Sequence, residues 1–475
     1  MSAPLNFYGR VDRALKDPAL QAAMRTSTTR LVSSRAAAMA IFPEADAVRD
    51  RARAIRAHTI ARLDHYLLEF ERNVRARGGH VHWAATADEA VRIVADIAGQ
   101  HGVRTAVKSK SMVSEEILLN PGLERAGVEV LETDLGEFVV QLSGDHPSHI
   151  VAPIIHWSKE EVAQLFRDKL HATGEEVSDV AHMTALVRRV LRANFLRADM
   201  GISGGNFGVA DTGGLCITTN EGNGRLTTTL PRVHVALMGI ERIVPTLDDL
   251  AVMLAVLGRS ATGQKLTVYS NILNGPRRHG SPGPRTEEAD GPEHLHIVLV
   301  DNGRSQLLGG DLAEILYCIR CGACLNICPV YQQVGGHAYG SVYPGPVGAV
   351  LTPALRGLQQ WHDLPQASSL CGACREICPV RIDIPRMLLT LRDETTRRGL
   401  TPRWVTFGLT VFRAVATRPA LFRRAQAMGG WASRRLATDG WIRHLPGHLA
   451  KWTQTRDFPA MPVKTFQQRW KERQP

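Results

Sequence analysis

The chain has 475 residues, which is too long for one hydrophobic core, so we expect two or three domains. Hydrophobic residues make up 44% and charged residues 22%, a balance typical of globular proteins and not of disordered ones. No apolar run approaches the roughly 20 residues that a membrane-spanning helix needs, and the charged N-terminal stretch lacks the apolar centre of a secretory signal. We therefore predict a cytoplasmic protein whose cysteines stay reduced and available to metals.

Residues 1–75 are expected to form an N-terminal helical segment. The stretch Ala45–Arg77 is rich in Ala, Arg, Leu and Glu, and its apolar residues recur at helical spacing. The helical pattern stops at Gly78-Gly79.

Residues 76–304 alternate between helix-like and strand-like segments. A helix is expected over Ala87–Ala98, and a Pro-, Gly- and Arg-rich surface loop over Gly275–Pro292. Strands are expected at Thr105–Lys108, Glu129–Glu132, His149–Pro153, Gly214–Thr219, Val233–Met238, Leu266–Tyr269 and His296–Val300. Strands separated by segments of helical length predict an α/β domain with a largely parallel sheet.

Glycine-rich and polar segments follow several of these strands. Glycines let a backbone turn tightly and approach a ligand, and polar groups at strand ends can bind a small anion or phosphate. The candidate pocket residues are Lys108, Asp211, Asn220, Glu221 and Asn223. The two acids among them are either acid/base groups or turn caps, and we favour the caps.

Residues 305–395 contain two cysteine motifs among short helices. The first is Cys318-x-x-Cys321-x-x-Cys324-x-x-x-Cys328-Pro329, and the second is Cys371-x-x-Cys374-x-x-x-Cys378-Pro379. This pattern is typical of two-cluster bacterial ferredoxins, in which the last cysteine of each run ligates the other cluster. The short spacings let a loop wrap one cube, and the proline suits the first turn of the helix that carries the last cysteine.

By that rule one cluster takes Cys318, Cys321, Cys324 and Cys378, and the other takes Cys328, Cys371 and Cys374. Ser368 stands where the fourth cysteine of the second set is expected. That cluster is therefore either a three-iron cluster or a four-iron cluster with the serine, water or a partner group as its fourth ligand. A zinc site fits poorly, because structural zinc uses paired CxxC knuckles. Cys216, the eighth cysteine, is expected to be a buried apolar residue.

Residues 396–475 form a basic segment that we expect to be helical. From Arg386 onward the chain has 18 Lys and Arg residues and 5 Asp and Glu residues, a net charge of +13, whereas the whole chain carries +11. Five of the eight tryptophans also lie here: Trp404, Trp431, Trp441, Trp452 and Trp470. Such a segment is a docking surface for an acidic partner or an anionic membrane, or else a solvated helical extension. Nucleic acid is not expected as a partner, because no nucleic-acid-binding fold is recognisable.

Several segments of the chain resemble the iron–sulfur subunit family of the bacterial lactate-utilisation system. They are Val107–Met112, Leu131–Phe138, Pro147–Pro153, Gly201–Asn206, Thr219–Asn223, Val300–Arg304, Cys318–Cys324, Gly335–Gly340, Tyr343–Gly348 and Leu370–Cys374. The resemblance runs from about residue 10 to the C-terminus, so it covers nearly the whole chain. Asp211 departs from the family pattern, in which Glu is expected at this position in many relatives.

The resemblance implies a LUD domain, with a fold similar to the CoA transferases, NagB and ribose-5-phosphate isomerase (RpiA). A mainly α-helical dicluster ferredoxin-like domain and a C-terminal extension would follow it. It also implies two [4Fe-4S] clusters held by seven cysteines. The implied activity is the oxidation of L-lactate to pyruvate in a complex with a cysteine-rich subunit and a second LUD subunit.

We predict that this chain relays electrons within such a complex, because it has no flavin or nicotinamide motif. Two alternatives remain open. The LUD domain could be an enzyme of isomerase or acyl transferase type, with structural or sensory clusters, which only fold analogy supports. The chain could also be a general ferredoxin-like adaptor, peripheral at the inner membrane surface, that serves a membrane quinone enzyme. No residue stands out as a carboxylate clamp, so the sequence does not place a lactate site.

Overall fold

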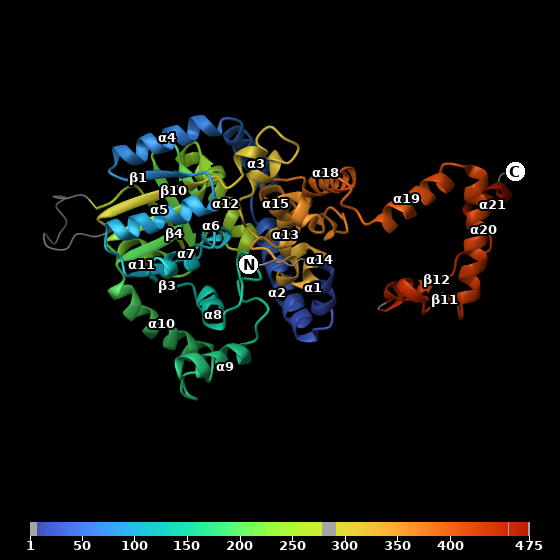
Figure 1. The fold of residues 1–475 in the computed structure, drawn as a ribbon, viewed down its shortest axis with the longest axis horizontal. Coiled ribbons are helices and arrows are strands. Elements are labelled where there is room, and N and C mark those ends of the chain that lie inside the picture. Colours follow the sequence, from blue (N-terminus) through green and yellow to red (C-terminus); the bar gives the residue numbers. More distant parts are fainter. Residues whose placement is uncertain (1–6, 278–290, 455, 474–475) are drawn as a thin grey trace. The chain divides into compact units, whose positions relative to one another are not determined.

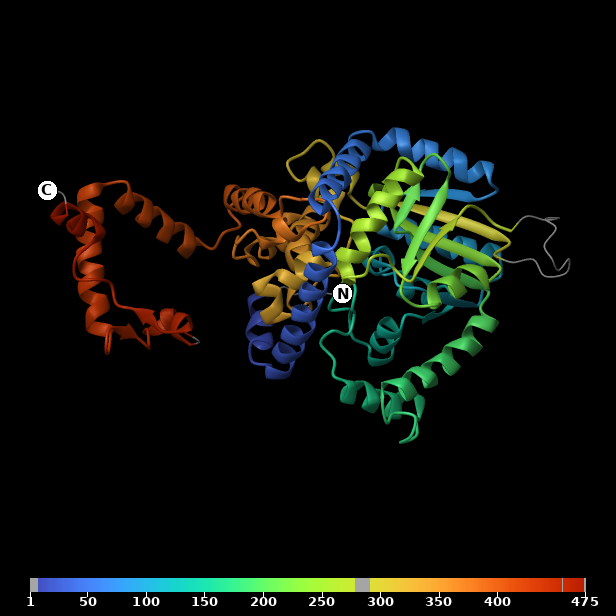
Figure 2. The same cartoon turned by 180° about the vertical axis from the view of Figure 1, so that it is seen from behind.

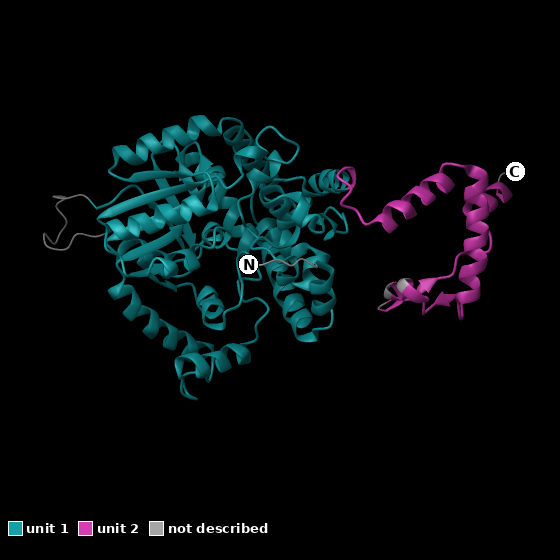
Figure 3. Ribbon diagram, in the orientation of Figure 1, with its two compact units in different colours: residues 1–395 teal, residues 396–475 magenta. Residues whose placement is uncertain are grey.

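The computed structural model describes residues 7–277, 291–454 and 456–473. The chain forms two compact units, residues 1–395 and residues 396–475, which are teal and magenta in Figure 3. Within the described residues, no helix is both long enough and apolar enough to cross a lipid bilayer.

A six-stranded parallel sheet forms the centre of the first unit (Figure 1). Its order is β1 (His80–Ala84), β10 (His294–Val300), β7 (Val233–Gly239), β4 (Met200–Gly204), β2 (Thr105–Lys108) and β3 (Glu129–Glu132). Every residue of β7 is buried, as expected for a strand in a parallel sheet covered on both faces. The predicted α/β domain with a largely parallel sheet is confirmed.

Helices and a second sheet surround this central sheet. Apolar residues of α5 (Ala87–Gln100) and α7 (Leu119–Arg125) share one core with the strands. A separate core joins α8 (Leu135–Ser143), α9 (Lys159–Leu170) and α10 (Val180–Arg197). The second sheet has the order β8 (Ile243–Val244), β5 (Phe207–Val209), β6 (Gly214–Thr219) and β9 (Tyr269–Leu273). A short helix, α11 (Asn223–Thr229), follows β6.

Three local predictions differ from the structure. His149–Pro153 is not a strand but part of a loop, and β9 begins only at Tyr269, where the strand predicted from Leu266 ends. The helical stretch from Ala45 is divided into α3 (Ala45–Ala61) and α4 (Leu63–Ala76), because Arg62 leaves the helical conformation with φ −131°. Residues 278–290 of the predicted surface loop lie outside the described residues.

The cysteine-bearing region consists of short helices. They are α13 (Ala323–Ile327), α14 (Pro329–Val334), α15 (Gly345–Arg356), α16 (Leu358–Trp361), α17 (Ala373–Ile377) and α18 (Ile384–Arg397). The N-terminal helices α1 (Phe7–Ala14), α2 (Pro18–Ala40) and α3 tie this region to the α/β domain. In Figure 2 the blue α2 and α3 run between the orange cysteine helices and the green α12 (Leu247–Thr262), and α2 contacts α12, α13 and α14.

The described residues of the second unit include three complete α-helices, one 3-10 helix (Gly447–Thr453) and one small strand pair. The α-helices are α19 (Arg403–Ala416), α20 (Pro419–Leu436) and α21 (Phe466–Glu472), and β11 (Trp441–Ile442) pairs antiparallel with β12 (Phe458–Pro459). The first turn of α21 is stabilised by a capping box between Thr465 and Gln468. Every residue of α19 is at least partly exposed, although the helix carries Trp404 and Phe407.

Candidate metal centres

The two cysteine loops repeat one unusual backbone conformation. Arg320 and Leu370, each directly before a cysteine, have φ +60° and +56°, a region that residues with a Cβ rarely adopt. Gly322 and Gly372, each directly after that cysteine, have φ +75° and +86° and precede α13 and α17. Strained backbone repeated at two sites indicates loops shaped for a common purpose.

Ser368 takes the place of a cysteine in the second loop. The backbone N–H of Arg320 donates to Cys318 Sγ at 3.4 Å, and the backbone N–H of Leu370 donates to Ser368 Oγ at 3.1 Å. The two side chains therefore hold equivalent positions, and the second loop has an oxygen where the first has a sulfur.

We call Cys318, Cys321, Cys324 and Cys378 the inner site. All four side chains line one cavity, whose other walls are mainly apolar and include Ile150 and Val347. The structure thus brings Cys378 of the second motif together with three cysteines of the first. Burial raises the pKa of Cys321 to about 12 and that of Cys378 to about 11, so these thiols ionise only when a cation stabilises the thiolates. Four converging thiols are the donor set that soft metals and iron–sulfur clusters require.

We call Cys328, Cys371 and Cys374 the outer site. Burial together with the neighbouring Cys328 and Cys371 raises the pKa of Cys374 to about 12, so the three thiols lie near one another. Cys371 is exposed, whereas each inner cysteine is buried or half-buried. The outer site therefore offers three thiols and opens to the surface.

Arginines from the N-terminal helices support the inner site. Arg35 Nη2 donates to the Ile377 carbonyl at 2.7 Å, and Arg49 Nη2 donates to the Cys378 carbonyl at 2.9 Å. Positive charge beside a thiolate cluster favours its ionised form. Sequence analysis missed both arginines, because the chain has many and their partners lie over 300 residues away.

A loop of the α/β domain closes against the cysteine region. His149 Nε2 and Asn326 Oδ1 are hydrogen-bonded at 3.0 Å, and the Tyr331 hydroxyl donates to the Ser148 carbonyl at 2.7 Å. The backbone N–H groups of Val151 and Ala152 turn inward and donate to His149 Nδ1. These bonds explain why this apolar stretch is a loop: its backbone pairs with a histidine ring instead of a neighbouring strand.

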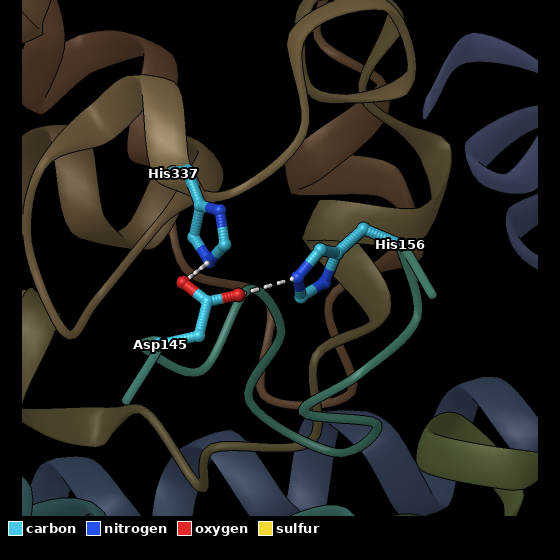
Figure 4. Close-up of side chains that lie close together, drawn as sticks. All are labelled: Asp145, His156 and His337. Atoms are coloured by element: carbon cyan, nitrogen blue, oxygen red, sulfur yellow. Dashed lines mark hydrogen bonds and ion pairs between the residues drawn. The ribbon is translucent and has the colours of Figure 1, made fainter. Parts of the chain in front are cut away.

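Three further ligand-type side chains meet at the same junction. Figure 4 shows the Asp145 carboxylate between the rings of His156 and His337, with Asp145 Oδ2 3.0 Å from His156 Nε2 and Oδ1 3.7 Å from His337 Nε2. Their ligand atoms lie within 4.8 Å of one another, a set that can hold a divalent metal ion. His337 Nε2 also donates to the His146 carbonyl at 2.6 Å, so hydrogen bonds alone account for the arrangement.

A cavity of about 600 Å³ lies at the carboxyl ends of β2, β4 and β7. Of the five predicted pocket residues, Asn220, Glu221 and Asn223 line it. The cavity wall partly desolvates the Glu221 carboxyl, and this and the nearby Asp134 raise its pKa, although much of the residue is exposed. A neighbouring, mainly apolar cavity of about 650 Å³ lies between α10 and α11. Glu221 and Asn223 line this cavity too, and no cysteine lines it.

The other two predicted pocket residues lie elsewhere. Lys108 is fully buried, with Nζ 2.8 Å from Glu132 and 3.0 Å from Glu115, and these acids raise its pKa despite burial. Asp211 is exposed, and its backbone carbonyl accepts a hydrogen bond from Asn73. Four basic residues outside the five predicted pocket residues also line the cavity: Arg30, Lys110, Arg242 and Arg320.

Comparison with known proteins gives three consecutive family matches. Residues 67–300 match the LUD domain, residues 314–382 match the 4Fe-4S dicluster domain, and residues 397–475 match the C-terminal domain of lactate utilisation protein B. Lactate utilization protein B of Bacillus pumilus (strain SAFR-032) is 43% identical over 98% of this chain and 97% of its own length. The chain belongs to the lactate utilisation protein B family.

The same family protein of Bacillus thuringiensis (strain Al Hakam) is also 43% identical, again over 98% of this chain and 97% of its own. A crystal structure of a DUF162 family protein from Deinococcus radiodurans covers 50% of this chain and 98% of its own, at 15% identity and a TM-score of 0.28, too low to bear on the fold. The dicluster match confirms the predicted iron–sulfur cofactors, with [4Fe-4S] favoured, over the zinc alternative.

Proposed function

We propose that this chain is the iron–sulfur electron-transfer subunit of a complex that oxidises L-lactate to pyruvate. The observation that carries the proposal is the exchange of cysteines between two adjacent sites, since Cys378 of the second motif lines the inner site. Such an exchange holds two clusters close together, as one-electron relay requires. The relatives' name supplies the link to lactate.

The seven motif cysteines divide between the two clusters. The inner site, Cys318, Cys321, Cys324 and Cys378, holds one cluster, and the outer site, Cys328, Cys371 and Cys374, holds the other. Each bound cluster supplies one-electron redox chemistry. The surrounding protein excludes water from the inner site and offsets the negative charge of its thiolates with Arg35 and Arg49. The exposed Cys371 marks the side from which a partner subunit can exchange electrons.

The proposed partners are a cysteine-rich subunit and a second LUD subunit, with the C-terminal unit as a docking surface. Residues 397–475 carry 16 Lys and Arg residues against 3 Asp and Glu residues. The side chains of Trp404 and Phe407 are 78% and 71% exposed. Positive charge beside exposed aromatic rings suits an acidic protein surface, and a membrane surface is the alternative.

The proposed architecture follows the same division. The α/β domain would share the fold of NagB, RpiA and the CoA transferases, with domain boundaries at 75/76, 304/305 and 395/396 and a helical C-terminal extension. The proposed location is the cytoplasm, with the second unit as the point of any contact with the inner membrane surface. Loss of vesicle binding on removal of residues 396–475 would favour the membrane alternative over the protein partner.

The test is reduction of the clusters by lactate. The chain is co-expressed with its partner subunits, purified anaerobically and mixed with L-lactate or with buffer, and electron paramagnetic resonance (EPR) spectra are recorded at low temperature. We expect a reduced-cluster signal with L-lactate, and the same signal in Cys216→Ser, because Cys216 lies in β6 and belongs to neither cysteine motif. A signal with dithionite but none with L-lactate would contradict the proposal.

An enzymatic role for the LUD domain is a second candidate, because Glu221 does line a cavity. A carboxylate with a raised pKa can act as a general base or a nucleophile. If Glu221 is catalytic, Glu221→Gln abolishes lactate-dependent turnover while the clusters remain reducible by dithionite. If the electron-relay function alone holds, this variant keeps turnover within about threefold of wild type.

A further inference from the structure

We propose that the cavity at the carboxyl ends of β2, β4 and β7 binds a small 2-hydroxycarboxylate, with Arg320 as its main anchor beside the inner site. The proposal rests on the proposed function, since that function suggests lactate as the ligand. The cavity, its charges and its position relative to the cysteines support it independently.

The position of Arg320 links the two cavities. Arg320 and Ile150 line both this cavity and the inner-site cavity, so the two cavities share part of their walls. Arg320 lies in the sequence between Cys318 and Cys321, and both of these cysteines belong to the inner site. An anion held by Arg320 would therefore lie next to the inner cluster.

Neighbouring side chains hold the guanidinium of Arg320 in place. The guanidinium stacks over the Tyr343 ring, 4.3 Å from its centroid, and Nη2 donates to Glu241 Oε1 at 3.2 Å. Nη1 is buried and has no hydrogen-bond partner among the described residues. A buried guanidinium nitrogen without a partner is destabilising, and a carboxylate in the cavity would satisfy it.

The acids near Arg320 are already paired with other cations. Glu241 accepts from Arg320 and also lies 2.8 Å from Arg304 Nε, while Arg304 Nη2 lies 2.6 Å from Glu116. Arg242, which also lines the cavity, donates to the Cys318 carbonyl at 2.8 Å and makes no ion pair among the described residues. This wall of the cavity therefore holds more positive than negative charge.

Lys110 is a second cation in the lining of the cavity. Lys110 Nζ is buried, lies 3.5 Å from Glu137 Oε1 and makes no hydrogen bond among the described residues. Burial raises the pKa of Glu137 to about 7, so near neutral pH this acid offsets the lysine only in part. Asp134 and Glu221 are the remaining acids that line the cavity, and Arg30 is the remaining base.

Asn223 adds a neutral group to the lining of the cavity. Its Oδ1 is buried and accepts no hydrogen bond in the described structure, so it can accept one from a hydroxyl group. Cations for a carboxylate together with an acceptor for a hydroxyl match the two functional groups of a 2-hydroxycarboxylate. The cavity volume of about 600 Å³ is within the range of small-molecule sites.

The test is calorimetric titration of the full chain, with both clusters assembled anaerobically, using L-lactate and inorganic phosphate as separate probes. Arg320→Gln and Lys110→Gln remove the two cations, and Arg381→Gln is the matched control. Arg381 also has a positive φ, +48°, close to a motif cysteine, but it pairs with Asp46 at the surface and does not line the cavity. The iron content of each variant is measured, and Arg320→Lys separates loss of charge from damage to the loop.

We expect L-lactate to bind the wild-type chain, with the Kd raised about tenfold or more by Arg320→Gln, less by Lys110→Gln, and less than about twofold by Arg381→Gln. Unchanged Kd values in both cavity variants at normal iron content would overturn the proposal. Binding of phosphate without binding of L-lactate would also overturn it, because the ligand would then be a different anion. If Arg320→Gln loses iron, the Kd values of Arg320→Lys and Lys110→Gln decide whether the proposal holds.

The same variants distinguish this proposal from the proposed function. If L-lactate binds and the cavity variants weaken it, but lactate never reduces the clusters in the complex, the site stands and the electron relay fails. If lactate reduces the clusters equally well in wild type and Arg320→Gln, the relay stands and the site fails.

Discussion

The inner and outer cysteine sites share one loop conformation and differ in what covers it. Arg320 and Leu370 have nearly the same positive φ, and Cys318 and Ser368 accept the same backbone hydrogen bond. The inner loop is covered by the N-terminal helices and by the loop around His149, whereas the outer loop exposes Cys371. The same loop conformation therefore occurs at one site beside the cavity that Arg320 lines and at one site beside solvent.

This difference gives the proposed electron path a direction. Electrons that arrive from a ligand near Arg320 would meet the inner cluster first and leave from the outer cluster, where a partner can approach. The following predictions test whether the two sites differ as this comparison requires.

The largest difference should appear in thermal stability. Cys324→Ser should remove the inner cluster and leave a poorly filled cavity in the middle of the first unit, lowering Tm by roughly 10 °C or more. Cys371→Ser should lower Tm by only a few degrees, because the outer site lies at the surface. Scanning calorimetry of the anaerobic protein measures both, with Cys216→Ser as the control for loss of a buried thiol. Equal losses at the two sites would contradict the comparison.

The next largest difference should appear in the rates at which the cysteines of the two sites are alkylated in the iron-free chain. Thiolates react with iodoacetamide and thiols do not, so the raised pKa values of Cys321 and Cys378 should protect them at pH 8. Reactivity should rise toward pH 11 to 12 as these groups ionise. Cys371 is exposed and should be alkylated at least about tenfold faster at pH 8. Mass spectrometry of timed samples gives the order, and modification of Cys321 before Cys371 would count against an enclosed inner site.

Ser368→Cys should make the outer site more like the inner one. Because Ser368 Oγ holds the position of Cys318 Sγ, a thiol there would complete a set of four. We expect slower loss of iron from the outer site in air, measured by Mössbauer spectroscopy, with Ser369→Cys as the control. Faster loss of iron than in wild type would show that the serine is itself a required ligand.

The smallest effect should come from the charges beside the inner site. Arg35→Gln removes a cation that acts on Cys321 and Cys378, so the inner cluster should become harder to reduce by tens of millivolts. The outer cluster should shift less. An EPR-monitored redox titration gives both potentials, and an equal shift at the two clusters would mean that the charge does not distinguish them.

Much of this arrangement was predictable from sequence because it depends on short spacings. The cysteine repeat, with the serine in the second loop, is visible over a few residues, and the buried strands β7 and β10 appear as apolar runs. The contacts that cover the sites join distant residues. His149–Pro153 has the composition of a strand, yet its partners are Asn326 and Tyr331.

The pocket residues show the same limit. Lys108 and Lys110 are two residues apart, and the five predicted pocket residues include only Lys108. Only the layout of the sheet shows that Lys108 is buried against Glu132, while Lys110, beyond the end of β2, reaches the cavity. Arg320 was overlooked because it lies within a cysteine motif, and Glu241 and Tyr343, which orient it, come from other parts of the chain.

The most direct test of the account is the exchange of cysteines between the motifs. EPR and Mössbauer spectra of Cys378→Ser and Cys328→Ser are compared with those of wild type after dithionite reduction. We expect Cys378→Ser to lose or alter the inner cluster, which Cys324→Ser also disrupts, and Cys328→Ser to alter the outer cluster, which Cys371→Ser disrupts. If Cys378→Ser instead affects the same cluster as Cys371→Ser, each motif holds its own cluster, and the proposed inner and outer sites are wrong.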